Sequence, residues 1–332
     1  MNRGQAMKLK NQNFSSVLVT STMPDRLNNN VSIRDYVING FEIAFPQVRL
    51  EKTSIDAAPG MIQANKPELV LAIGSLAIDS IDFWSLRRAC DKVGAVLAFW
   101  LHDDPYEFDY SFKVEGIPDV VFTNDAWALE HYQHPNVYHL PMAGCEKTHF
   151  RPIEDKERPI TGFFCGVGYP NRVTIFRQAA TILNRFNTVV LGDNWPSDLL
   201  FAQNTRIDPS LFADYAADSL ITFNIGRYFN IANQRYALMA STPGPRTFEV
   251  ALAGSAQLFF VDSLEVEDYF EPDSEIILFD SMKDIEEVFQ RAVDEPEWVI
   301  GIARQGQQRA LKEHCYHHRV DKIMEACYYS AT

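Results

Sequence analysis

Three residues with the means to do chemistry gather in one short segment: Arg246, Thr247 and Glu249. They follow a Gly/Pro loop and precede small apolar residues and Gly254, a pattern that predicts a short helix ending at the glycine. Arg246 and Thr247 then lie at the helix N-terminus, where free N–H groups and the dipole favour an anion such as a diphosphate. Glu249 can accept hydrogen bonds from a pair of hydroxyls, as on a ribose. The segment therefore predicts a nucleotide-sugar pocket, although an ordinary capped helix in a βα unit would look the same.

Further candidates for the same ligand stand in loops after predicted strands: Gly166, Arg172, Trp195, Asn224 and Arg227. Gly166 lets a backbone approach a ligand, and Arg172 and Arg227 can each meet a phosphate. Trp195 offers a stacking face to a nucleobase, or it simply covers the core. A plain βα turn explains Gly166 and Arg172 equally well, and a surface ion pair explains Arg227.

A histidine and two carboxylates end an apolar strand in the first half of the chain: His102, Asp103 and Asp104. Adjacent carboxylates repel each other, which can raise the pKa of one of them and make it a general base for an acceptor hydroxyl. The alternative is a turn or helix cap around Asp104-Pro105. The eight histidines are dispersed, so no metal site is predicted.

Apolar runs of strand length alternate with helical patterns, which predicts parallel sheets with crossover helices. The predicted strands of the first series are 16–20, 68–73, 95–100, 119–123 and 137–140, and those of the second are 161–165, 188–192, 220–225, 257–261 and 275–279. The composition changes near 140–159, where Phe150-Arg-Pro152 is typical of a linker. We therefore expect an α/β protein with two Rossmann-like domains, 1–150 and 151–310, and a C-terminal helix over 311–332 that packs back on the first. Parallel sheets of this kind bind ligands at their carboxyl edges, which predicts a central cleft.

Composition narrows the partners and the compartment. The 332 residues carry a formal net charge of −14, which argues against a large nucleic-acid footprint. No apolar run approaches the roughly 20 residues needed to span a bilayer, and the polar N-terminus does not have the pattern of a signal peptide. The five cysteines are scattered without metal spacing, as expected of free thiols in a reducing compartment. These features predict a cytoplasmic, soluble protein.

Beyond these local patterns, the chain resembles the CgeB-like (spore-maturation) glycosyltransferases of the GT-B superfamily over about Leu69 to Arg319. The resemblance rests on ordered pieces: Trp100-Leu-His-Asp-Asp-Pro105, Val121-Phe-Thr-Asn124, His139-Leu-Pro-Met-Ala143, Phe150-Arg-Pro152, Phe163-Phe-Cys-Gly166, Asn171-Arg172, Leu191-Gly-Asp-Asn-Trp195, Phe223-Asn-Ile-Gly-Arg227, Arg246-Thr-Phe-Glu249, Ala253-Gly254 and the tail from His314 to Arg319. It implies a nucleotide-sugar donor on the second domain and an acceptor held mostly by the first.

The resemblance also implies roles for single residues. Glu249 would bind the donor ribose, with Arg246 and Thr247 near the diphosphate. Gly166 would allow close approach of the donor and Trp195 would lie near the base, while Asn224 and Arg227 would lie near the phosphates or the sugar. In one respect the chain departs from many retaining relatives, which carry a second glutamate where this chain has Ser241.

We expect a metal-independent glycosyltransferase with no cofactor other than its co-substrate, a nucleotide sugar that is UDP-linked. The acceptor would be a glycan, a protein or a small molecule with a hydroxyl group, and Asp103 or Asp104 would be the base if the enzyme inverts. Two alternatives stay open: a non-catalytic sugar-nucleotide or glycan-binding protein on the same scaffold, and a nucleotide-sugar epimerase.

Overall fold

The structure, a computed structural model, describes residues 14–331 and divides into two compact units. Unit 1 holds the described residues up to Met142, the segment Asn230–Thr242 and the chain from Tyr316 onward. Unit 2 holds Ala143–Phe229 and Pro243–Cys315. Each unit is built on a six-stranded sheet in which every neighbouring pair of strands is parallel. The predicted α/β class is therefore confirmed.

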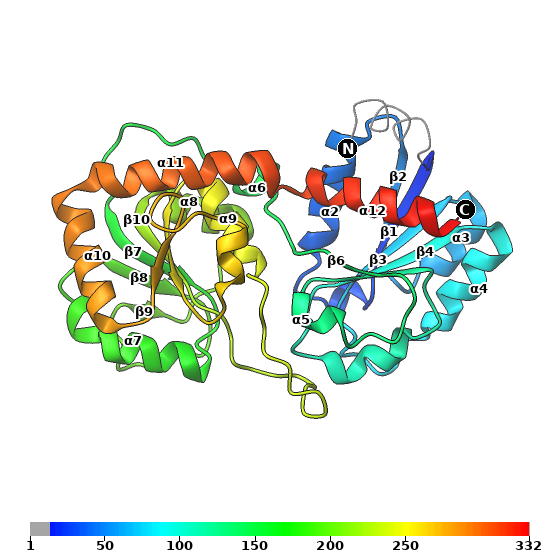
Figure 1. Cartoon of the computed structure of the whole chain (residues 1–332), viewed down its shortest axis with the longest axis horizontal. Coiled ribbons are helices and arrows are strands. Elements are labelled where there is room, and N and C mark those ends of the chain that lie inside the picture. The colour runs from blue at the N-terminus through cyan, green and yellow to red at the C-terminus, as the bar shows by residue number, and fades with distance from the viewer. Residues whose placement is uncertain (1–13, 332) are drawn as a thin grey trace. The chain divides into compact units, whose positions relative to one another are not determined.

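Unit 1 has the strand order β2-β1-β3-β4-β5-β6 (Figure 1). Its strands are β1 Ser16–Ser21, β2 Arg49–Thr53, β3 Leu69–Gly74, β4 Val96–Leu101, β5 Val120–Thr123 and β6 Val137–His139. Its helices are η1 Asp25–Leu27, α2 Ser32–Ala44, α3 Ala58–Asn65, α4 Phe83–Val93, η2 Phe108–Val114, α5 Ala126–Leu129 and α12 Tyr316–Ala331, with η1 and η2 being 3₁₀ turns. Every residue of β1, β3, β4 and β5 is buried, as expected of parallel strands covered on both faces.

Unit 2 has the strand order β12-β11-β10-β7-β8-β9. Its strands are β7 Ile160–Cys165, β8 Thr188–Leu191, β9 Ala202–Gln203, β10 Ser219–Asn224, β11 Ala256–Phe260 and β12 Ile277–Phe279. Its helices are α6 Glu146–His149, α7 Pro170–Leu183, α8 Pro209–Ala217, α9 Pro245–Ala253, η3 Leu264–Asp268, α10 Met282–Asp294 and α11 Pro296–Glu313, with η3 a 3₁₀ turn. Chain order reverses between β7 and β10, which is the topological switch point of a classic dinucleotide-binding sheet.

The C-terminal helix α12 belongs to unit 1 and packs along α2 (Figure 1). Gly40 of α2 makes this close contact feasible, since a Cβ there would lie 2.8 Å from the backbone carbonyl carbon of Tyr316. Arg319 on α12 donates through Nε to the Pro141 carbonyl at 2.9 Å. In the described part of the chain, no helix is both long enough and apolar enough to cross a membrane.

The segment Asn230–Thr242 corrects the predicted domain 151–310, because it belongs to unit 1 although unit 2 flanks it on both sides. Two carboxylates hold it there. Asp109 accepts backbone N–H bonds from three consecutive residues, Gln234 to Tyr236. Asp125 accepts the N–H groups of Ser241 and Thr242 at 2.8 and 3.2 Å. Local sequence does not predict these hydrogen bonds, since each carboxylate is more than a hundred residues away from its partners.

Candidate active site

In unit 2, the loops after β7 and β10 meet at the switch point, where open parallel sheets bind ligands. Arg172, at the start of α7, joins the two loops. Its Nε donates to the Ile225 carbonyl at 3.0 Å, and its Nη1 donates to the Val167 carbonyl at 3.1 Å. The guanidinium is therefore engaged with main-chain carbonyls, and it shapes the edge of the sheet instead of presenting itself alone to a phosphate.

Helix α9, Pro245–Ala253, carries Arg246, Thr247 and Glu249, and it ends at Gly254 as predicted. Gly244 is the N-cap, Pro245 occupies the first turn, and Gly254 ends the helix in the left-handed region with φ of 74°. Arg246 Nη1 lies 2.9 Å from Glu249 Oε2, with 34% of the Arg246 side chain and 14% of the Glu249 side chain exposed. The structure therefore brings this cation and this carboxylate together at the N-terminal end of the helix.

Arg246 also packs against an aromatic ring. Its guanidinium carbon lies 3.7 Å from the ring centroid of Phe212 on α8, a cation–π arrangement. The ring fixes the plane of the guanidinium, while about a third of the side chain still reaches solvent. A planar, partly exposed guanidinium at a helix N-terminus suits a diphosphate.

Thr247 and Asn224 lie inside the unit instead of at its edge. Thr247 is fully buried and Asn224 is 8% exposed. Asn224 Nδ2 donates to Thr247 Oγ1 and to Gln257 Oε1, each at 2.7 Å. These side chains therefore tie β10, α9 and β11 to each other, and direct contact of their polar groups with phosphates or sugar is not supported by this geometry.

Gly166 and Trp195 also have structural partners. The Trp195 ring is 4% exposed and packs edge-on to Phe164 and Phe176, and its indole N–H donates to the Gly166 carbonyl at 2.9 Å. Of the two interpretations offered for Trp195, packing over the core is the one that fits, since no ring face is open for a base. The Gly166 carbonyl also lies where a Cβ on Gly192 would be, at 1.9 Å, so glycine at 192 is needed for the two loops to meet.

Arg227 follows Gly226 in the loop after β10 and is partly exposed. A residue that the sequence reasoning missed, Asp262, follows β11 and approaches the same loop, because a Cβ on Gly226 would lie 2.4 Å from Asp262 Oδ2. Burial raises the pKa of Asp262 to about 6, against a smaller lowering by backbone hydrogen bonds. Its position after a strand was the available signal, but aspartate is also common in plain turns.

In unit 1 the predicted trio lies directly after β4. His102 Nδ1 is 3.5 Å from Asp103 Oδ2, with 6% of the His102 side chain and 15% of the Asp103 side chain exposed. Asp104 is 2% exposed, and its Oδ2 accepts hydrogen bonds from Thr123 Oγ1 at 2.7 Å and Tyr132 Oη at 2.6 Å. Of the two aspartates, Asp103 is the one with access to a substrate hydroxyl, and Asp104 fixes the loop.

Burial governs the protonation of Asp104. It raises the pKa of this carboxyl to about 7, although the two hydroxyl donors lower it and the charges of Asp125 and Asp103 raise it further. The repulsion expected between adjacent carboxylates is thus a contribution, with burial the larger cause.

A third carboxylate near this loop, Glu107, was not singled out from the sequence. Its Oε1 accepts the Leu76 N–H at 2.6 Å, and its Oε2 accepts the Ser75 hydroxyl at 2.5 Å. Ser75 and Leu76 follow β3, which lies beside β1 at the switch point of the unit 1 sheet. Burial, followed by the charge of Asp103, raises the pKa of Glu107 to about 8. A glutamate two residues after Pro105 gives no sequence signal of such burial, because its partners lie some thirty residues away.

A family model and a sequence relative each match part of this chain. Residues 172–325 match the family model described as glycosyl transferase-like. The spore protein CgeB of Bacillus subtilis is 24% identical over 212 residues, which cover 60% of this chain and 64% of CgeB. The chain thus spans less than two thirds of that relative.

Solved structures share the fold at low sequence identity. HepE of Anabaena in complex with UDP and glucose superposes with a TM-score of 0.59 at 9% identity, covering 93% of this chain and 98% of HepE. Sucrose-phosphate synthase of Thermosynechococcus elongatus gives 0.61 at 10% identity, covering 94% and 98%. Together, the family match, the spore protein and these structures confirm the predicted resemblance to the CgeB-like glycosyltransferases and the GT-B class of fold.

Proposed function

We propose that this protein is a glycosyltransferase that moves a sugar from a nucleotide-sugar donor to a hydroxyl-bearing acceptor. The observation that carries the proposal is the pair Arg246 and Glu249, which stand 2.9 Å apart on the first turns of α9 within the matched residues 172–325. A guanidinium can pair with the diphosphate of a sugar nucleotide, and a carboxylate can accept hydrogen bonds from the ribose diol. UDP is the proposed nucleotide, since HepE is described with UDP and glucose.

In the proposed reaction, an acceptor oxygen forms a bond to the anomeric carbon and the bond from that carbon to the diphosphate breaks. The electron pair stays on the departing nucleoside diphosphate. Arg246 and the N-terminus of α9 stabilise the negative charge that develops there, without a requirement for a metal ion or another cofactor.

The acceptor proton has two destinations, depending on stereochemistry. If the configuration inverts, Asp103 of unit 1 takes it, since Asp103 is more accessible than Asp104 and lies beside His102. If the configuration is retained, the leaving phosphate takes it. Ser241 stands where many retaining relatives have a glutamate, and here its backbone N–H and its hydroxyl both lie against Asp125.

Thermal unfolding in the presence of UDP, GDP, TDP, ADP and their common sugars tests the donor site, because a ligand that binds only the folded state raises Tm. We expect a selective rise with UDP or a UDP-sugar, much smaller in Glu249→Ala because UDP binds that variant more weakly, and retained in Glu267→Ala, which removes an exposed glutamate of the same unit. No rise with any nucleotide in a folded sample would count against the proposal.

Turnover separates the remaining alternatives. A transferase releases UDP slowly in water and faster with an acceptor, and Arg246→Ala abolishes both reactions. Conversion of the donor into another sugar nucleotide without an acceptor would instead identify an epimerase. Binding without any turnover above background would identify a non-catalytic binding protein.

A further inference from the structure

His149, the last residue of α6, is fully buried in unit 2 and has a defined hydrogen-bonding state. Its Nδ1 accepts the backbone N–H of Cys145 at 3.1 Å. A ring nitrogen that accepts carries no proton, so the neutral imidazole carries its hydrogen on Nε2. That nitrogen lies 3.7 Å from Oε1 of Glu249. This separation is longer than a hydrogen bond, so the Nε2–H lies close to the carboxylate that the proposed function assigns to the donor ribose without being hydrogen-bonded to it.

The charged groups around His149 favour this neutral form. Burial lowers the pKa of His149, the charge of Glu249 raises it, and the charges of Arg246 and Arg151 lower it again. A neutral N–H donor orients a carboxylate without neutralising its charge. Glu249 therefore keeps its ability to accept hydrogen bonds while Arg246 holds Oε2 and His149 faces Oε1.

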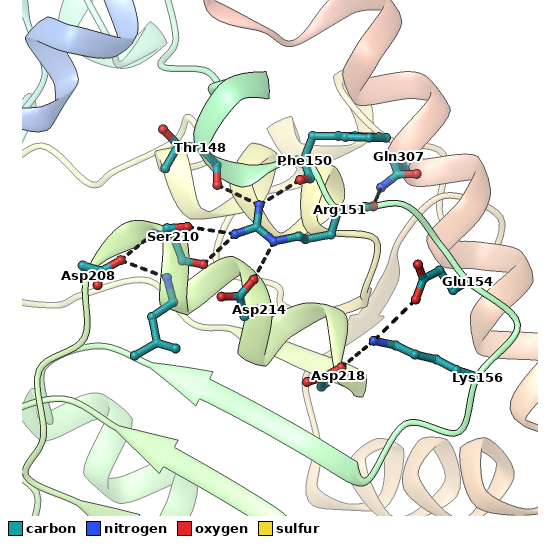
Figure 2. Close-up of polar contacts among 11 residues, drawn as sticks. Thr148, Phe150, Arg151, Glu154, Lys156, Asp208, Ser210, Asp214, Asp218 and Gln307 are labelled. Carbon is teal, nitrogen blue, oxygen red and sulfur yellow. Dashed lines mark hydrogen bonds and ion pairs between the residues drawn. The ribbon is translucent and has the colours of Figure 1, made fainter.

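A four-residue helix cannot hold His149 in place alone, and Arg151 supplies the support (Figure 2). Arg151 Nη1 donates to the carbonyls of Thr148 and Phe150 at 3.1 and 2.8 Å. Its Nε donates to Asp214 Oδ1 at 2.6 Å, and its Nη2 donates to the Ser210 carbonyl at 2.9 Å. The chain on either side of His149 is thus fixed to α8.

Helix α11 also contacts Arg151. Gln307 Nε2 donates to the Arg151 carbonyl at 2.7 Å (Figure 2). It also donates to the Leu252 carbonyl of α9 at 2.8 Å. Helix α8 also carries Phe212, on which Arg246 rests. The two residues next to the Glu249 carboxylate therefore both depend on α8: Arg246 packs on the Phe212 ring, and the chain around His149 is bonded to α8 through Arg151.

We propose that His149 is a positioning residue, which sets the orientation of the Glu249 carboxylate for the ribose of a nucleoside diphosphate through its Nε2–H, with Arg151 as its support. This inference rests on the proposed function, because it assigns His149 a role in donor binding. A packing role alone would require only a ring of this size at this place.

Two substitutions separate positioning from packing. His149→Phe keeps a buried ring but removes both nitrogens, whereas His149→Gln places an amide N–H near the position of Nε2. We expect UDP to bind His149→Phe about tenfold more weakly, measured by calorimetry, and His149→Gln within about threefold of the unchanged protein. Equal affinity for UDP in all three proteins would overturn the proposal, as would equal weakening in both variants with an equal fall in Tm.

A double-mutant cycle shows whether His149 acts through Glu249. In the Glu249→Ala background, His149→Phe should have no further effect on the Kd of UDP, so the tenfold effect disappears, which is a coupling of about 1.4 kcal/mol. Additive effects would mean that His149 acts on binding independently of Glu249, contrary to the proposal.

Failure of the proposed function has a different signature, since the unchanged protein would then bind no nucleotide. The positioning role would still be decided by a crystal structure of His149→Phe. Rotation of the Glu249 carboxylate away from Arg246 supports it, and an unmoved carboxylate overturns it.

Discussion

Replacing Glu107 with glutamine should make the stability of unit 1 less sensitive to pH. Glu107 is 1% exposed and accepts hydrogen bonds from the Leu76 N–H and the Ser75 hydroxyl. Its pKa rises from 4.5 to about 8, mainly because burial disfavours the charged carboxylate. Glutamine has the same shape, keeps a carbonyl oxygen for the Leu76 N–H and cannot ionise.

The sign and size of the effect follow from linkage. Below pH 4.5, Glu107 is protonated in both folded and unfolded protein, and its ionisation costs nothing. Between pH 4.5 and about pH 8 the unfolded chain releases this proton while the folded protein keeps it, so stability falls as pH rises. The loss is about 1.4 kcal/mol per pH unit at most, so Glu107→Gln should gain roughly 2 to 3 kcal/mol relative to the unchanged protein between pH 5.5 and 7.5.

Urea unfolding of both proteins at pH 5.5, 6.5 and 7.5 measures this difference, followed by the fluorescence of the five tryptophans, three of which lie in unit 1. Other groups with shifted pKa values, such as Asp104, are common to both proteins and largely cancel. Glu115→Gln, which removes an exposed carboxylate of the same unit, measures the background. A difference between Glu107→Gln and the unchanged protein that stays constant over the three pH values would refute the reasoning.

Three further predictions concern single contacts. Gly192→Ala should destabilise unit 2 by more than about 3 kcal/mol, because its Cβ would lie 1.9 Å from the Gly166 carbonyl oxygen at a φ of 143°. Gly60→Ala in α3 has open space around it and should stabilise unit 1 by about 0.5 kcal/mol. Urea unfolding measures both variants, and equal effects would contradict the steric argument. Arg151→Met keeps the aliphatic stem but loses the hydrogen bonds to α8, and should lower unit 2 stability by about 1–2 kcal/mol in the same assay, the value being modest because 23% of the side chain is exposed; an unchanged midpoint would show that these bonds contribute nothing. Asp125→Ala removes the acceptor of the Ser241 and Thr242 N–H groups, so limited proteolysis should cut within Asn230–Thr242 at least tenfold faster than in the unchanged protein; an unaltered rate would show that the remaining contacts, such as those of Asp109 and Tyr106, are enough to hold the segment.

The regular elements could be predicted from sequence where burial is uniform. Strand β4 has only apolar residues, and its predicted range lies within a residue of its bounds, whereas the edge strand β2 carries Arg, Glu and Lys, has only one buried residue, and has no apolar run to mark it. The residues directly after β3 do not continue into α4, which begins at Phe83, and among them Leu76 donates its N–H to Glu107. That contact spans thirty-one residues, and no local pattern encodes it.

The candidate site divides in the same way. Arg246 and Glu249 could be predicted because residues three positions apart in a helix lie on the same face, here close to the helix N-terminus. Trp195 and Thr247 have side chains suited to a ligand, yet the fold buries them, and residue type alone does not decide between a core and a cavity. His149 was missed because its role depends on the tautomer set by Cys145 and on an orientation toward α9, both of which are properties of the folded chain.

The way in which the chain is shared between the units has a consequence for synthesis on the ribosome. The chain passes from one unit to the other after Met142, Phe229, Thr242 and Cys315. Unit 1 begins first, yet it still lacks Asn230–Thr242 when its sixth strand emerges, and α12, which covers α2, is made last of all. Unit 2 therefore has its whole sequence available before unit 1 does. Nascent chains truncated before Tyr316 should expose the surface of α2 around Gly40. Unit 1 is therefore the first unit to begin translation and the second to complete its fold.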